Sequence, residues 1–182
     1  APTEIYPLSL HDALPIWRAG RSFRWRLWGV AELGYDSTFF YAMAAGASLR
    51  YSLPEALGLR VAISGNWASG DYDAEGPMRA FKPIRAGTVA TIATTAFTDA
   101  LGCALDASIS PLRGLTVGAG GAAILKPGDA VPYRGAEAQA RVAYKPVSDV
   151  ALSLSGGAFF PNASAGSGDV EWTAALKATL SL

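Results

Sequence analysis

The sequence predicts an all-β fold. The expected architecture is an antiparallel up-and-down transmembrane β-barrel of about eight strands, either complete or the C-terminal part of a larger barrel. Three observations lead to this prediction: apolar and polar residues alternate along most of the chain, short turns alternate with longer loops, and aromatic residues gather near the ends of the alternating segments. Side chains of a strand point alternately to its two faces, so each segment has one apolar and one polar face.

The composition agrees with this fold class. Of the 182 residues 51% are hydrophobic but only 16% are charged, a low share for a soluble surface. No apolar run reaches the roughly 18–20 residues that a membrane helix needs, so strands would have to make any contact with a bilayer. The 15 basic and 15 acidic residues cancel, which gives no electrostatic footprint for nucleic acid.

The first four predicted strands span residues 23–35, 39–51, 57–67 and 101–109. The first places aromatic and aliphatic residues at odd positions and arginines at even ones. The second follows an Asp-Ser-Thr turn and ends before Leu-Pro-Glu-Ala, which is turn chemistry. The third and fourth repeat the alternation on either side of the long connection 68–97.

The last four predicted strands span residues 115–125, 136–144, 150–160 and 171–182. The final one alternates most clearly, with Trp, Ala and Leu on one parity and Glu, Thr and Lys on the other. Segments of roughly 10–14 residues exceed the usual soluble strand and suit a tilted bilayer crossing.

Connections of two kinds join these strands. The joints that contain Pro54, Pro111 and Pro146 are short, whereas the connections 68–97, 127–133 and 161–168 are mostly longer. Short turns on one rim and longer loops on the other are typical of bacterial outer-membrane barrels.

The aromatic residues of the apolar parity are sorted by height. If the first strand rises from the short-turn rim, they form two belts around an aliphatic band, as interfacial anchoring of Trp and Tyr produces. The predicted belt of the loop rim contains Tyr35, Phe39, Tyr41, Trp67, Phe160 and Trp172. The predicted belt of the turn rim contains Phe23, Trp25, Tyr51 and Tyr144.

The opposite parity carries the charged residues of the strands. Seven cations and four anions in a dry core would be prohibitive, so we expect these side chains to line a water-filled lumen with a net charge of +3 (7 − 4). The expected lumen-lining residues are Arg24, Arg26, Glu32, Arg50, Arg60, Asp106, Glu137, Arg141, Lys145, Glu171 and Lys177.

Residues 1–16 differ from the rest of the chain. They have no basic segment, apolar segment or cleavage site of a signal peptide, and they resemble a translated sequencing adapter. We expect a non-native or disordered leader outside the sheet, the alternative being a native leader or plug segment. Residues 17–182 form the expected barrel, which is then the C-terminal piece of a longer protein.

Candidate chemistry is sparse. The sequence holds one histidine, His11, and one cysteine, Cys103, which excludes a Ser-His nucleophile from the barrel, an internal disulfide and a His or Cys metal site. The loop Asp71-x-Asp73-x-Glu75-Gly76 copies the start of a calcium loop, but Lys82 stands at the twelfth position, where a bidentate acid is needed. We therefore expect no enzyme, no cofactor and no dedicated metal site.

One stretch resembles a known family. Ser69, Gly70, Asp71 and Gly76, followed by the Phe81-Lys-Pro83 step, are similar to a loop of alginate-export-type porins and related outer-membrane barrels. The resemblance covers roughly twenty residues and implies a bacterial outer-membrane barrel, often with more strands than eight. The chain departs from it by ending in Leu182, where barrel assembly signals usually have an aromatic residue.

The function expected from the sequence is a porin-like channel of the bacterial outer membrane. Its partners would be the lipid bilayer and small solutes, preferably anions, that diffuse passively past the cationic wall. One alternative is a closed eight-stranded barrel, filled by its own side chains, that serves as a structural anchor or as an adhesin through residues 68–97. A more distant alternative is a soluble ligand-binding β-barrel.

Overall fold

The computed structural model describes residues 4–9, 17–19, 22–36, 38–70, 77–80, 98–165 and 168–180. Within them the chain forms one ten-stranded antiparallel sheet and a short 3-10 turn, η1 (Ala163–Ala165). The described residues contain no helix that could cross a membrane. The strands are β1 (Glu4–Ser9), β2 (Trp17–Ala19), β3 (Phe23–Asp36), β4 (Thr38–Leu53), β5 (Leu59–Ala68), β6 (Ala100–Leu112), β7 (Leu115–Leu125), β8 (Tyr133–Val147), β9 (Val150–Pro161) and β10 (Glu171–Leu180).

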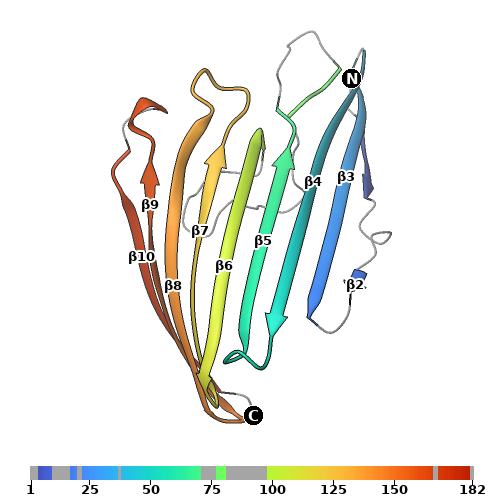
Figure 1. Cartoon of the computed structure of the whole chain (residues 1–182). Coiled ribbons are helices and arrows are strands. Elements are labelled where there is room, and N and C mark those ends of the chain that lie inside the picture. Colours follow the sequence, from blue (N-terminus) through green and yellow to red (C-terminus); the bar gives the residue numbers. More distant parts are fainter. Residues whose placement is uncertain are drawn as a thin grey trace.

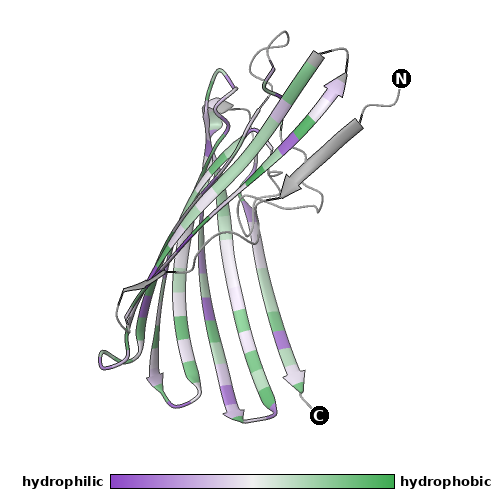
Figure 2. Cartoon of the chain, turned by 90° about the vertical axis from the view of Figure 1, so that its right-hand side faces the viewer, coloured by the Kyte–Doolittle hydropathy of each residue, from purple (hydrophilic) through white to green (hydrophobic). Residues whose placement is uncertain are grey.

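The strands β3 to β10 follow one another in space as they do along the chain, so the sheet is a simple up-and-down meander (Figure 1). These are the eight strands that the alternation predicts, and their all-β, antiparallel, up-and-down arrangement is confirmed. The sheet curls but stays open (Figure 2). In the described part of the chain β1 lies at one edge and β10 at the other.

The expectation that residues 1–16 stay outside the sheet is wrong for Glu4–Ser9. These six residues pair with β3 from Tyr35 to Val30, and β2 pairs with β3 further along, from Trp25 to Phe23. The outer edge of β3 presents unpaired backbone groups, which any extended segment can satisfy. Both β1 and β2 pair with the same edge of β3. From Ser9 to Trp17 the chain moves on by eight residues (17 − 9), whereas their partners on β3, Val30 and Trp25, are five apart (30 − 25), a difference of three residues.

Two prolines that were expected to lie in turns lie inside strands. Pro111 belongs to β6 and Pro146 to β8, and at each the register shifts, between Ile109 and Leu112 and between Tyr144 and Val147. Proline has no N–H to donate and is tolerated in a sheet at such irregular positions. The two strands therefore run closer to the turn rim than the sequence predicts.

The third predicted strand begins later than expected. Leu57, its predicted first residue, lies in the turn with a φ of 52°, followed by Gly58 with a φ of 63°. β5 starts at Leu59, whose N–H donates to the Ala56 carbonyl at 2.9 Å. Two successive left-handed residues reverse the chain within a short turn.

The pairing registers place the charged positions of neighbouring strands on the same face of the sheet. Arg24 lies opposite Arg50, Arg50 opposite Ala62, Ala62 opposite Asp106, and Asp106 opposite Gly120. We call this side, continued by the odd residues of β8, β9 and β10, the polar face, and the other side the apolar face. The alternation of hydropathy along the coloured strands is visible in Figure 2.

Burial divides the two faces in the opposite way from a soluble sheet. The buried strand side chains that the structure describes lie on the polar face, toward the longer connections: Glu32, Ala42, Ala44, Ala68, Ala100, Ala122, Ile124, Glu137 and Phe159. Trp28 and Val30 pack against the alanines of β4 and β5. On the apolar face Trp172 and Leu176 are each 79% exposed. A soluble protein rarely exposes an apolar face of this extent.

Candidate functional site

Two adjoining hollows open on the polar face in its short-turn half. One has a volume of about 590 Å³ and the other of about 690 Å³, and both are lined by Arg24, Arg50 and Arg60. The charged residues of the first hollow come from five strands, β3, β4, β5, β6 and β8. They are Arg24, Arg26, Arg50, Arg60, Asp106 and Arg141.

The three shared residues, which we call the arginine cluster, stand on neighbouring strands. Arg24 and Arg50 are direct cross-strand partners, and Arg60 lies on β5 opposite Ser52 on one side and Ser108 on the other. Neighbouring strands are about 4.8 Å apart, and all three arginines line both hollows. Among the described residues no carboxylate forms an ion pair with any of the three.

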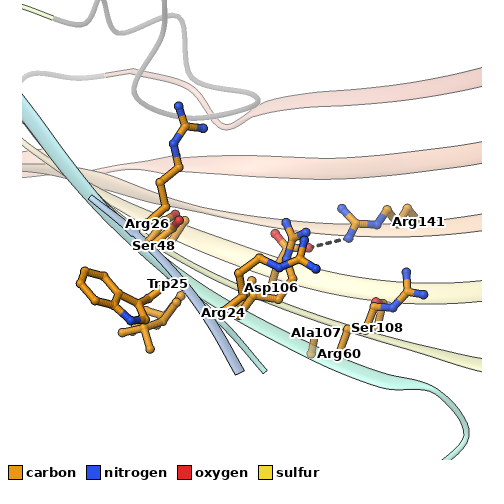
Figure 3. A pocket seen from close by; sticks show the side chains of 15 residues that line it. Arg24, Trp25, Arg26, Ser48, Arg60, Asp106, Ala107, Ser108 and Arg141 are labelled. Atoms are coloured by element: carbon orange, nitrogen blue, oxygen red, sulfur yellow. Dashed lines mark ion pairs between the residues drawn. The ribbon is translucent and has the colours of Figure 1, made fainter. Parts of the chain in front are cut away.

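Arg141, by contrast, has a partner. Its Nη2 atom lies 2.9 Å from Oδ1 of Asp106, and the pair reaches from β8 to β6 over β7 (Figure 3). A Cβ on Gly120 would lie 2.7 Å from Asp106 Oδ2, and one on Gly118 would lie 3.1 Å from Arg141 Nε. The small residues of β7 therefore leave the space in which the ion pair forms.

The electrostatic character of the hollow follows from this inventory. Five arginines and one aspartate give a formal charge of +4 (5 − 1). In Figure 3 Arg141 points toward Asp106, while the indole of Trp25 points away from both. A concave surface of one charge sign raises the local concentration of counter-ions, here anions. The described residues contain no group of acidic, His or Cys side chains that could hold a metal ion.

Of the eleven residues expected to line a lumen, six meet in this hollow. Glu32 and Glu137 share the polar face but are buried in its loop half, at 6% and 4% exposure. Glu171 and Lys177 lie on the exposed strand β10, and Lys145 lies in the irregular end of β8.

Serine hydroxyls accompany the arginines, although the expected lumen-lining residues include none of them. Ser48, Ser64 and Ser108 line the first hollow, and Ser52 and Ser110 line the second. Each shares the parity of the charged residue on its own strand, which is Arg50 on β4, Arg60 on β5 and Asp106 on β6, so the same alternation places these serines on the polar face. The expected lumen-lining residues are all charged, because charged side chains decide the cost of burial.

The aromatic residues expected in two belts lie on the apolar face near strand ends. Phe23 pairs with Tyr51 at the turn end of β3 and β4, and Tyr35 pairs with Phe39 at their loop end. Tyr133, the first residue of β8, is 43% exposed and also lies opposite an apolar-face residue, Leu125. The sequence predicts residues 127–133 as a loop, so Tyr133 is not among the expected belt residues.

The loop that carries the family resemblance is described only in part, at residues 68–70 and 77–80. Ser69 is fully buried; its hydroxyl donates to the Arg79 carbonyl at 2.8 Å and accepts from the Met43 N–H at 3.0 Å. A Cβ on Gly70 would lie 2.4 Å from Oδ1 of Asp99. His11, the calcium-like loop 71–76 and the Phe81-Lys-Pro83 step lie outside the described residues. Cys103 is exposed on the apolar face.

No family model matches the chain, and no curated protein matches it.

Proposed function

We propose that the chain forms wall strands of a porin-like channel of the bacterial outer membrane, through which small anionic solutes diffuse passively. The observation that carries the proposal is the inverted arrangement of the two faces. Large hydrophobic side chains such as Leu105, Leu154 and Leu176 are 55%, 55% and 79% exposed, whereas the arginines line a hollow on the other side.

Lipid is the solvent that suits the exposed face. The regularly paired positions of the apolar face in β3–β10 carry no charged residue in the described part of the chain. An arginine or lysine at the bilayer midplane of a barrel strand costs about 2–4 kcal/mol, so a face without charged residues is what contact with hydrocarbon requires. Aromatic residues near the strand ends would anchor it at both interfaces.

Water is the solvent that suits the arginine side. The cations stand where the polar face is hollow, and cationic groups on the wall of a water-filled pore favour anions. The packed side chains of the loop half, among them Trp28 and Phe159, would narrow the pore there. A closed wall would require the edge strands β1 and β10 to pair with each other or with further strands. The resemblance of residues 68–84 to alginate-export-type porins supports the same assignment.

Single-channel conductance in planar bilayers tests this function. We expect the product of the full-length gene to give ion-conducting steps with a preference for anions. Replacement of Arg24, Arg26 and Arg60 with Glu turns three cations of the wall into anions and should shift the preference toward cations, because the sign of the wall charge sets the local ion concentrations. Absence of conducting steps, or unchanged ion selectivity in the triple variant, would contradict the proposal.

A second candidate is a filled barrel that serves as an anchor, and the packing of Trp28, Ile124 and Phe159 on the polar face favours it. Thiol labelling separates the candidates from a soluble barrel. In a Cys103→Ala background, cysteines at Leu105 and Leu176 should react with lipid-soluble reagents only, and a cysteine at Ser64 with aqueous ones. Membrane labelling without conductance identifies the anchor, and aqueous labelling of both faces identifies a soluble protein.

A further inference from the structure

The arginine cluster is the most concentrated unpaired charge in the described part of the chain. Arg24 and Arg50 face each other directly across β3 and β4, and like charges in that position destabilise a sheet. Arg60 adds a third cation on the next strand, and both hollows open onto all three. The nearby pair of Asp106 and Arg141 shows that the same face neutralises a cation where a carboxylate is present.

The composition around the cluster selects the kind of ligand that would neutralise it. Arginine presents a planar fork of N–H donors that matches the paired oxygens of phosphate and carboxylate. Hydroxyl donors stand beside the forks, since Ser52 and Ser108 are the cross-strand partners of Arg60. Three cations within three neighbouring strands suit one compact anion of several charges better than an extended chain whose charges are spaced along a pore.

We infer that Arg24, Arg50 and Arg60 form a binding site for a compact oxyanion of the phosphate or pyrophosphate type, dissolved in the water that the polar face contacts. This inference rests on the proposed function and specifies it, since the site lies on the wall that anions would pass. Hollows of about 590 and 690 Å³ leave room for a phosphorylated small molecule.

Isothermal titration calorimetry with pyrophosphate tests the site on the full chain in detergent micelles at about 0.15 M salt, a concentration that screens isolated surface charges. We expect saturable binding. Arg50→Gln should weaken it by about tenfold, because a charge-assisted hydrogen bond and one unit of charge are lost. Arg50→Lys should restore it only in part, because lysine keeps the charge but lacks the fork.

Lys177→Gln is the matched control. Lys177 also lies on the polar face, but on β10, and its removal subtracts the same single charge. A discrete site predicts less than about a twofold change in this variant. Absence of saturable binding, or equal weakening in Arg50→Gln and Lys177→Gln, would overturn the site in favour of a diffuse field.

Two further measurements, urea unfolding and single-channel conductance, complete the test. Arg50→Gln removes one member of a like-charge pair, so its urea unfolding midpoint should not fall; if the variant fails to fold, Arg60→Gln takes its place. Calorimetry needs no ion flow, so its outcome is separate from that of the conductance experiment. Binding without conductance removes the channel and keeps the site, and conductance without binding does the reverse.

Discussion

Single glycines decide which side chains meet on the polar face. Gly118 and Gly120 of β7 lie beneath the ion pair between Asp106 and Arg141, which joins strands that are not neighbours. Gly46 plays the same part on β4, because a Cβ there would come within 2.4 Å of the indole nitrogen of Trp28. Trp28 can therefore lie across β4 and pack against the alanines beside it.

Gly120→Ala should destabilise the fold by about 1–3 kcal/mol, because the new methyl group would lie 2.7 Å from Asp106 Oδ2 and 2.9 Å from the Leu105 carbonyl oxygen. The measurement is urea unfolding followed by circular dichroism. Gly65→Ala is the control, since its Cβ would meet its nearest atom, the Gly102 carbonyl oxygen, at an ordinary 3.8 Å. Equal midpoints for the two variants would show that β7 has no special need for glycine.

At the scale of elements, the long connection after β5 is tied back to the sheet at its beginning. Pro77 accepts a hydrogen bond from the Tyr41 N–H at 2.8 Å, and the Arg79 N–H donates to the Tyr41 carbonyl at 2.9 Å. These residues extend the sheet along the part of β4 that β5 does not reach, since the pairing of β5 ends at Ala44. The buried hydroxyl of Ser69 joins β4 to this segment, because it bonds both the Met43 N–H and the Arg79 carbonyl.

Ser69→Ala should cost about 1–3 kcal/mol of unfolding free energy, since the Met43 N–H and the Arg79 carbonyl would each lose a buried partner. Ser64→Ala on β5, the strand that precedes Ser69, removes a partly buried hydroxyl and should change the free energy by less than about 0.5 kcal/mol. We would measure both by urea unfolding, with limited proteolysis at residues 70–99 as a local readout. An unaffected proteolysis pattern in Ser69→Ala would contradict the anchoring role.

The strands could be predicted because the alternation of apolar and polar residues is present in the sequence of each strand by itself. Positions that depend on pairing could not. The segment Glu4–Ser9 shows no alternation of hydropathy that would predict a strand, and only its pairing with β3 identifies it. The strands β6 and β8 continue through Pro111 and Pro146 by shifts in pairing register, and such shifts depend on the neighbouring strands. The ion pair over β7 was hidden for the same reason, whereas the shared face of the arginines followed from parity alone.

Over the whole molecule, the charges of the polar face are separated along the strand direction. The cations Arg24, Arg26, Arg50 and Arg60 stand toward the short turns, where β3 and β5 begin and β4 ends. The acids Glu32, Glu137 and Glu171 stand toward the longer connections, near the end of β3 and the start of β8 and β10. Asp106, near the middle of β6, lies between the two groups.

If the polar face lines a pore, this separation makes the two mouths unequal: anions gather at the turn end and cations at the loop end. We therefore expect single channels to pass unequal currents at opposite voltages, by about twofold at low salt, where charges act over tens of ångströms. Arg26→Gln and Glu171→Gln, which weaken opposite ends, should each reduce the asymmetry. At about 1 M salt the screening length falls to roughly 3 Å and the asymmetry should vanish. Symmetric currents at low salt, or an asymmetry that salt leaves unchanged, would show that wall charge does not govern the flow of ions.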